Sequence, residues 1–384
     1  MKTRKLLPLA IAFLSIISCK GNEKQEVAKL TTPEAIVTTN NQFIKVALLL
    51  DTSNSMDGLI DQAKAQLWEI VNELSYAKCK NKQPNLQIAL YEYGNDGLSS
   101  YDDYIRKIIG FTSDLDDVSK ELFSLTTNGG NEYCGAVIQS SLEKLDWGNN
   151  PDDLKMIFIA GNEPFTQGKI NYQDATTNAK EKGVIVNTIF CGDYNQGVSS
   201  SWKEGAQLTN GDYMSINHNQ QTVHISTPYD DVILQLNIKL NKTYVYYGES
   251  GKRKMEVQQQ QDSNASGYSK ANAVSRTVTK GSHLYKNSTW DLVDAEEEVE
   301  DFSFETLKEE ELPDNLKGKS SKEIKIYVEA KRKERVEIQN EIASLNKKRK
   351  NYIENLNQEN SNALESAMIN AIKKQAKKKN YTWD

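Results

Sequence analysis

Residues 46–56 read Val-Ala-Leu-Leu-Leu-Asp-Thr-Ser-Asn-Ser-Met, and this stretch decides the fold. Its first five residues are all apolar, which is typical of a β-strand that is buried on both faces of a parallel sheet. From Asp57 to Leu74 the apolar residues instead recur at spacings of three and four, which predicts an amphipathic helix. A buried strand that leads through a polar loop into a helix indicates an α/β protein.

The same alternation continues along the chain. Strand-like runs recur at residues 86–93, 105–111, 156–160 and 184–190, and helical patterns recur at residues 116–125, 135–145, 172–182 and 202–208. Strands that alternate with helices predict a doubly wound, mostly parallel sheet with helices on both faces. Because no helix separates residues 86–93 from residues 105–111, we expect these two strands to form an antiparallel hairpin at one edge.

The polar loop after the first strand has the pattern DxSxS, formed by Asp51, Ser53 and Ser55. In open α/β sheets, ligands bind outside the carboxyl ends of the strands. The loop resembles the first loop of the von Willebrand factor A family, which has the integrin I-like fold. The resemblance implies a metal ion-dependent adhesion site (MIDAS), in which hard carboxylate and hydroxyl oxygens bind Mg²⁺ or Mn²⁺. The alternative interpretation is that these side chains only cap the following helix.

Two further loops extend the resemblance over residues 43–247. Family members carry a threonine in a Gly-rich loop before the third helix, where residues 126–135 of this chain read TTNGGNEYCG. They also carry an aspartate after the fourth strand, where residues 159–164 read IAGNEP. The resemblance implies that a partner's carboxylate completes the metal site, and it assigns the ligand positions to Asp51, Ser53, Ser55, Asn131 and Asn162.

Two of these positions depart from the family pattern, because Asn131 stands where threonine is usual and Asn162 where aspartate is usual. The loss of a carboxylate reduces the attraction that offsets dehydration of the cation. The neighbouring Glu132 and Glu163 are able to restore charge, and Thr126 or Thr127 takes the threonine's place if the register of the loop differs. A degenerate site that binds no metal is the alternative.

The N-terminus predicts export. A basic segment with Lys2, Arg4 and Lys5 precedes the apolar run 6–17, which is typical of a secretory signal peptide at residues 1–18. Ile16-Ile17-Ser18-Cys19 resembles the bacterial lipobox, so Cys19 is expected to carry lipid; an ordinary signal peptide is the alternative. Residues 19–42 contain few large apolar side chains and predict a flexible tether. We therefore expect a lipid-anchored protein of the bacterial cell envelope, at the outer membrane on its periplasmic face or at the surface.

Composition excludes several functions. A net charge of −6 argues against a nucleic-acid binder. The chain has three histidines, and no nucleophile, acid–base pair or cofactor loop has convincing spacing, so we do not expect an enzyme. Cys79, Cys134 and Cys191 leave two alternatives open, which are a Cys134–Cys191 disulfide and three buried thiols.

The last third of the chain differs from the rest. Residues 248–300 are expected to be a linker and an ambiguous segment, because residues 258–267 are polar and without periodicity. Residues 301–384 are expected to be helical, either as an intramolecular hairpin, which we favour, or as a coiled-coil dimer. The prediction rests on a 4-3 spacing at Ile324, Val328, Lys331, Arg335, Ile338, Ile342, Leu345, Arg349, Tyr352 and Leu356.

Two functional hypotheses follow. The first is an envelope-anchored binding module that engages a protein partner through a divalent cation at the carboxyl ends of the strands. The second is a metal-independent scaffold lipoprotein that has a degenerate metal site and interacts through its helical region. The sequence does not identify the partner.

Overall fold

The computed structural model describes residues 42–219, 225–355 and 363–383. The predicted signal peptide, the lipidation site Cys19 and nearly all of the tether lie outside the described residues. Residues 41–384 form one compact unit.

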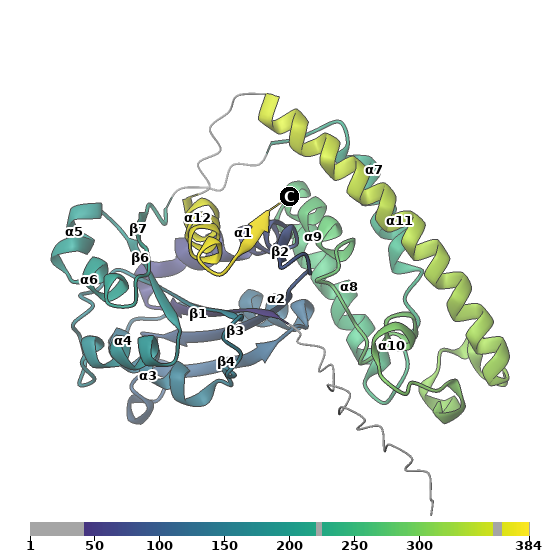
Figure 1. The fold of residues 1–384 in the computed structure, drawn as a ribbon, viewed down its shortest axis with the longest axis horizontal. Coiled ribbons are helices and arrows are strands. Elements are labelled where there is room, and N and C mark those ends of the chain that lie inside the picture. Colours follow the sequence, from purple (N-terminus) through teal and green to yellow (C-terminus); the bar gives the residue numbers. More distant parts are fainter. Residues whose placement is uncertain (1–41, 220–224, 356–362, 384) are drawn as a thin grey trace, which may run out of the picture. The chain divides into compact units, whose positions relative to one another are not determined.

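The central element is a six-stranded sheet with the order β4-β3-β1-β5-β6-β7 (Figure 1). Every neighbouring pair is parallel except β3 and β4, so the predicted antiparallel hairpin at the edge is confirmed. The doubly wound, mostly parallel fold is also confirmed. The strands are β1 (Phe43–Asp51), β3 (Asn85–Tyr93), β4 (Ile105–Thr112), β5 (Leu154–Gly161), β6 (Ile185–Cys191) and β7 (Tyr213–Ile216).

Alternate residues of β1 belong to two different hydrophobic cores, one on each face of the sheet. Val46, Leu48 and Leu50 pack in the core formed with α1 (Asp57–Leu74) and α2 (Leu115–Ser124). Ala47 and Leu49 pack in the core formed with α3 (Cys134–Lys144) and α4 (Tyr172–Glu181). Because both faces of β1 are buried, its sequence is a continuous apolar run. The short helices α5 (Tyr194–Ser199) and α6 (Trp202–Gln207) follow β6.

The end of the chain returns to the sheet. Helix α12 (Ala363–Lys377) packs against α1 and β7 (Figure 1). Its residues Leu364, Met368 and Ile372 belong to the core that contains α1 and α2. The short strand β8 (Tyr381–Trp383) then pairs with β2 (Ala77–Cys79), which follows α1. Residues that lie more than 300 positions apart in the sequence thus belong to one core.

The described residues between β7 and α12 are mainly helical, including much of the part that was expected to be a linker. It contains α7 (Asp230–Asn241), α8 (Gly251–Tyr268), α9 (Lys270–Lys280), α10 (Leu292–Glu298), the short 3₁₀ turns η3 (Phe304–Thr306), η4 (Glu309–Glu311) and η5 (Asp314–Leu316), and α11 (Ser321–Asn355). The expectation of a flexible junction at residues 258–267 was wrong, because these residues belong to α8.

Buried polar contacts explain why α8 has no apolar period. Gln258 donates a hydrogen bond to the Tyr285 hydroxyl at 3.1 Å, and Gln261 accepts one from Ser119 at 2.9 Å. Both glutamine side chains are almost completely buried. A helix that packs through amides and hydroxyls lacks the apolar stripe on which a sequence-based prediction depends.

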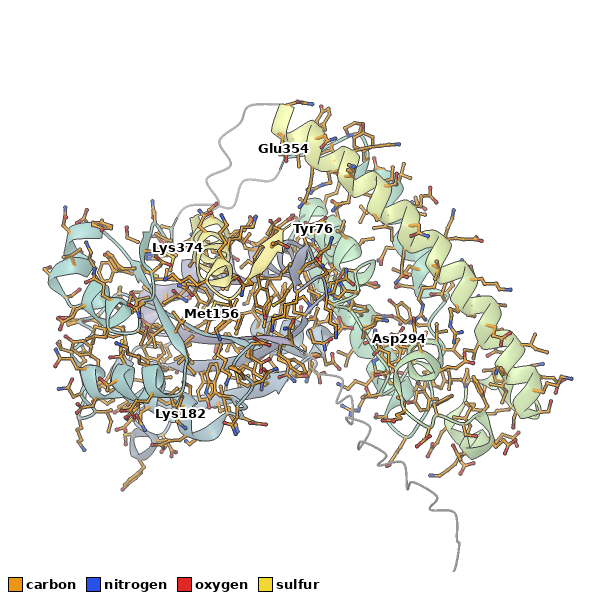
Figure 2. All side chains as sticks on the ribbon, viewed as in Figure 1. Tyr76, Met156, Lys182, Asp294, Glu354 and Lys374 are labelled. Atoms are coloured by element: carbon orange, nitrogen blue, oxygen red, sulfur yellow. The ribbon has the colours of Figure 1, made fainter. Side chains whose placement is uncertain are left out.

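Most residues of the predicted 4-3 spacing that are apolar or arginine are buried on one face of α11. This face packs against α7, α9 and α10 of the same chain, and not against the second helix of a hairpin. The arginines that interrupt the apolar spacing make buried ion pairs. Arg335 lies 2.7 Å from Asp291 and 2.9 Å from Asp294 of α10, which is labelled in Figure 2. Arg349 lies 3.3 Å from Asp230 of α7. The helical C-terminal region is therefore confirmed, whereas α12 packs against the sheet domain instead of forming the second arm of a hairpin.

The three cysteines in the described residues are buried thiols. Cys79, Cys134 and Cys191 are all free and buried, so of the two alternatives the three buried thiols are confirmed and the Cys134–Cys191 disulfide is not formed. Burial raises the pKa of the Cys134 and Cys191 thiols well above the usual value, so both are poor nucleophiles.

Candidate functional site

The predicted site lies at the carboxyl ends of β1 and β5, at the rim of the sheet. Asp51 is the last residue of β1 and its side chain is fully buried. The backbone N–H of Ser53 donates to Asp51 Oδ1 at 2.7 Å, and the backbone N–H of Thr52 donates to the Tyr93 carbonyl of the neighbouring strand at 2.9 Å. These bonds fix the start of the DxSxS loop relative to the sheet.

The structure brings the first and third predicted loops together. The Ser53 and Ser55 hydroxyl oxygens lie 3.2 Å apart. Asn162, which directly follows β5, donates from Nδ2 to the Ser55 hydroxyl at 3.1 Å. Four of the five candidate ligands, including Asp51, therefore belong to one cluster of oxygen-bearing side chains.

The fifth candidate does not join this cluster. Asn131 is exposed, and no hydrogen bond connects it to the other four candidates within the described ranges. The next residue, Glu132, takes the inward position, with 3% of its surface exposed. The two threonines of this loop lie elsewhere, since Thr127 donates to the carboxylate of Asp57 and the carbonyl of Thr126 accepts from Asn95 at 3.1 Å.

The carboxyl groups of Asp51 and Glu132 interact as a buried pair. Burial, reinforced by the hydrogen bond and charge of Glu132, raises the pKa of Asp51 well above its usual range. Burial also raises the pKa of Glu132, although contacts with Asp51 and Ser53 lower it in part. Two carboxylates in contact repel each other, so the pair is stable only with a proton or a cation.

Two glycines leave the space that these carboxyl groups occupy. Gly94 has a φ of +79°, and a Cβ atom there would lie 2.7 Å from Cγ of Glu132 and 2.8 Å from Oδ1 of Asp51. A Cβ atom on Gly161 would lie 2.5 Å from the Tyr93 hydroxyl and 3.1 Å from Oδ2 of Asp51. The backbone is therefore shaped around the acid pair.

Three buried oxygens of this cluster lack a hydrogen-bond donor. They are Asp51 Oδ2, Glu132 Oε2 and Asn162 Oδ1. All three are acceptors, which is the pattern expected where a hard cation binds. In the described part of the chain no group of three or more His, Cys, Asp or Glu side chains could hold a metal ion, so any cation here also needs hydroxyl and amide oxygens.

Sequence reasoning named Glu132 only as a neighbour that restores charge. The position of its side chain is set by the turn before α3, which the sequence does not determine. Tyr93, the last residue of β3, is fully buried beneath the site, where its hydroxyl donates to the Ala160 carbonyl at 2.9 Å.

Comparison with known proteins extends this description. The family model "von Willebrand factor type A domain" matches residues 45–217. A search of curated proteins finds no match.

Three solved structures illustrate the similarity. The conserved hypothetical protein BatB from Bacteroides thetaiotaomicron is 17% identical, with a TM-score of 0.35, and the match covers 45% of this chain and 90% of that chain. The SpRpn10 VWA domain is 16% identical, with a TM-score of 0.35 and coverage of 46% and 90%. Proximal thread matrix protein 1 from the mussel byssus, solved with a zinc-occupied MIDAS motif, is 13% identical, with a TM-score of 0.36 and coverage of 47% and 43%.

The family match spans the sheet from β1 to β7 and includes all three loops of the site. Residues 45–217 of this chain therefore form a von Willebrand factor type A domain.

Proposed function

We propose that this protein is an envelope-anchored binding module that engages a protein partner through a divalent cation at the rim of the sheet. The observation that carries the proposal is the set of buried acceptor oxygens without donors, beside the Ser53 and Ser55 hydroxyls. Oxygen-only ligand sets suit Mg²⁺ and Mn²⁺.

The residues present fit such a cation. Asp51, Ser53, Ser55 and Asn162 would hold it, and Asn131 would reach it only after its loop rearranges. When bound, the cation supplies positive charge that offsets the buried acids and a coordination position for an oxygen of the partner. Envelope anchoring rests on the sequence pattern that ends at Cys19. None of the described helices is long and apolar enough to cross a membrane.

The proposal is tested by titrating Mn²⁺ and Mg²⁺ into residues 41–384 in a calorimeter, with Asp51→Asn as the matched variant. Asn keeps the size of the side chain and removes the carboxylate charge, so we expect at least a tenfold loss of Mn²⁺ affinity. Lys80→Gln, a change at an exposed residue outside the site, serves as a control that should bind as the unmodified chain does.

An absence of binding heat in the unmodified chain would remove the cation from the function. The alternative would then stand, in which the protein is a metal-independent scaffold that interacts through its helical region. Two features favour that alternative: Asn162 in place of aspartate, and the exposed apolar side chains Ile326 and Val336 on α11.

A further inference from the structure

The side chain of Glu132 lies close to residues of all three loops of the rim. Its carboxyl group lies near the side chains of Asp51 and Ser53 in the first loop and near Glu163 in the third. Glu132 itself belongs to the second loop, just before α3 begins at Cys134. The side chain thus lies where the three loops meet.

The backbone holds Glu132 in this position. A Cβ atom on Gly130 would lie 2.4 Å from the carbonyl oxygen of Gly94, so the second loop is pressed directly against the end of β3. This close approach turns the following residues so that Glu132 is buried and Asn131 is exposed. Replacing either glycine would force the two loops apart.

The acid pair lacks a basic partner. Neither Asp51 nor Glu132 forms an ion pair with a lysine or arginine in the described residues, and neither carboxyl group has a basic neighbour among its main electrostatic contacts. Each also has one buried oxygen without a donor. Buried carboxylates are normally paired or bound to a metal, so this arrangement points to a missing positive charge.

We propose that Glu132 is a ligand of the rim cation and supplies the second carboxylate that the chain lacks at Asn162. The inference rests on the proposed function. Two carboxylates, from Asp51 and Glu132, balance the two charges of Mg²⁺ or Mn²⁺ from within the chain. Glu163, the other acid beside the loops, is exposed and accepts a hydrogen bond from Gln167 at 3.1 Å, so it does not take this role.

The test compares Glu132→Gln with Glu163→Gln in residues 41–384, which form one compact unit. Both substitutions remove one carboxylate and keep the side-chain size. We expect Glu132→Gln to weaken Mn²⁺ binding at least tenfold in calorimetry and Glu163→Gln to change it less than threefold. Thermal unfolding gives a second readout, since Mn²⁺ should raise the melting temperature of the unmodified chain and of Glu163→Gln, but not that of Glu132→Gln.

The outcomes separate the two proposals. If the unmodified chain and Glu132→Gln bind Mn²⁺ equally well, Glu132 is not a ligand and the proposed function stands. If the unmodified chain gives no heat, both proposals are overturned. Should Glu132→Gln not fold, Glu132→Asp provides the test, because it keeps the carboxylate but shortens the side chain by one methylene group. An Mn²⁺ affinity at least tenfold weaker than that of the unmodified chain would then support the inference, and an affinity within threefold would refute it.

Discussion

Replacing Ile372 with alanine should destabilise the core of the sheet domain, although Ile372 lies far beyond the family match in the sequence. Ile372 is fully buried on α12 and belongs to the hydrophobic core that contains the β1 residues Val46, Leu48 and Leu50. If α12 is part of that core, removing three carbon atoms from its centre must weaken the whole domain.

The size of the effect follows from the burial. Truncating a fully buried isoleucine to alanine costs about 2–5 kcal/mol, because apolar contacts are lost and a cavity remains. The unfolding entropy is about 2.1 cal/mol/K per residue, so a unit of about 340 residues has an unfolding entropy of roughly 0.7 kcal/mol/K. A loss of about 3 kcal/mol should therefore lower the melting temperature by about 4 °C.

Differential scanning calorimetry of residues 41–384 measures this shift, and the chain offers a matched control. Ile326 on α11 is 58% exposed, so Ile326→Ala makes the same chemical change where little apolar surface is buried. We expect the control to change the free energy of unfolding by less than about 0.5 kcal/mol. Melting temperatures of the two variants that agree within a degree would refute the conclusion that α12 belongs to the core. A separate low-temperature transition for Ile372→Ala would also refute it.

Two further predictions concern the buried charges of the helical region. Arg335→Met should cost about 3–5 kcal/mol in urea denaturation, because it leaves two carboxylates of the α10 region buried and unpaired. Arg332, also on α11, forms a partly exposed ion pair with Glu296 of α10, so Arg332→Met should cost less than about 1 kcal/mol. Equal losses of stability in the two variants would contradict the importance of burial. Burial opposes ionisation of Asp262, but Lys280 and Arg276 outweigh it and lower the pKa of Asp262 below its usual value. The folded state therefore binds fewer protons than the unfolded state below about pH 4, so stability is present above that pH and is lost as the pH falls. Between pH 5 and pH 3 the free energy of unfolding of Asp262→Asn should fall less than that of the unmodified chain. An equal fall would show that this carboxylate does not cause the loss of stability at low pH.

The sheet was predictable because its central strands are buried on both faces. The apolar run at residues 46–50 and those at residues 156–160 and 184–190 each correspond to a strand in the structure. The edge strand β7 was missed, since Tyr213–Ile216 is short and three of its four residues are only partly buried. A short strand at the edge of a sheet carries little periodicity.

The helices between β7 and α12 were harder to predict. Helix α9 buries Asn272, Ser275 and Thr279, and hydrogen bonds join these residues to α1. When buried polar side chains form hydrogen bonds with residues far away in the sequence, the sequence alone suggests a segment exposed to solvent. The docking of α12 on α1 depends on contacts across almost 300 residues, which no local pattern encodes.

The site was predictable as three loops and not as individual side chains. The order of strands places residues 51–55 and Asn162 at neighbouring strand ends, and the structure brings Ser55 and Asn162 within hydrogen-bonding distance. In the Gly-rich loop, whether Asn131 or Glu132 points inward depends on the close approach of Gly130 to the backbone of Gly94. A sequence does not show such a contact.

The packing of α12 and β8 against the sheet domain affects when the chain can finish folding during its synthesis. A ribosome adds about 5–20 residues per second, so roughly 7–30 s separate the end of β7 from the appearance of α12. During that interval the apolar surface of α1 and the sheet that α12 later covers stays open to solvent or to a chaperone. The nascent domain thus reaches its final form only after residues 363–383 have been synthesised, and a shorter recombinant piece that ends at residue 217 would leave that apolar surface permanently exposed.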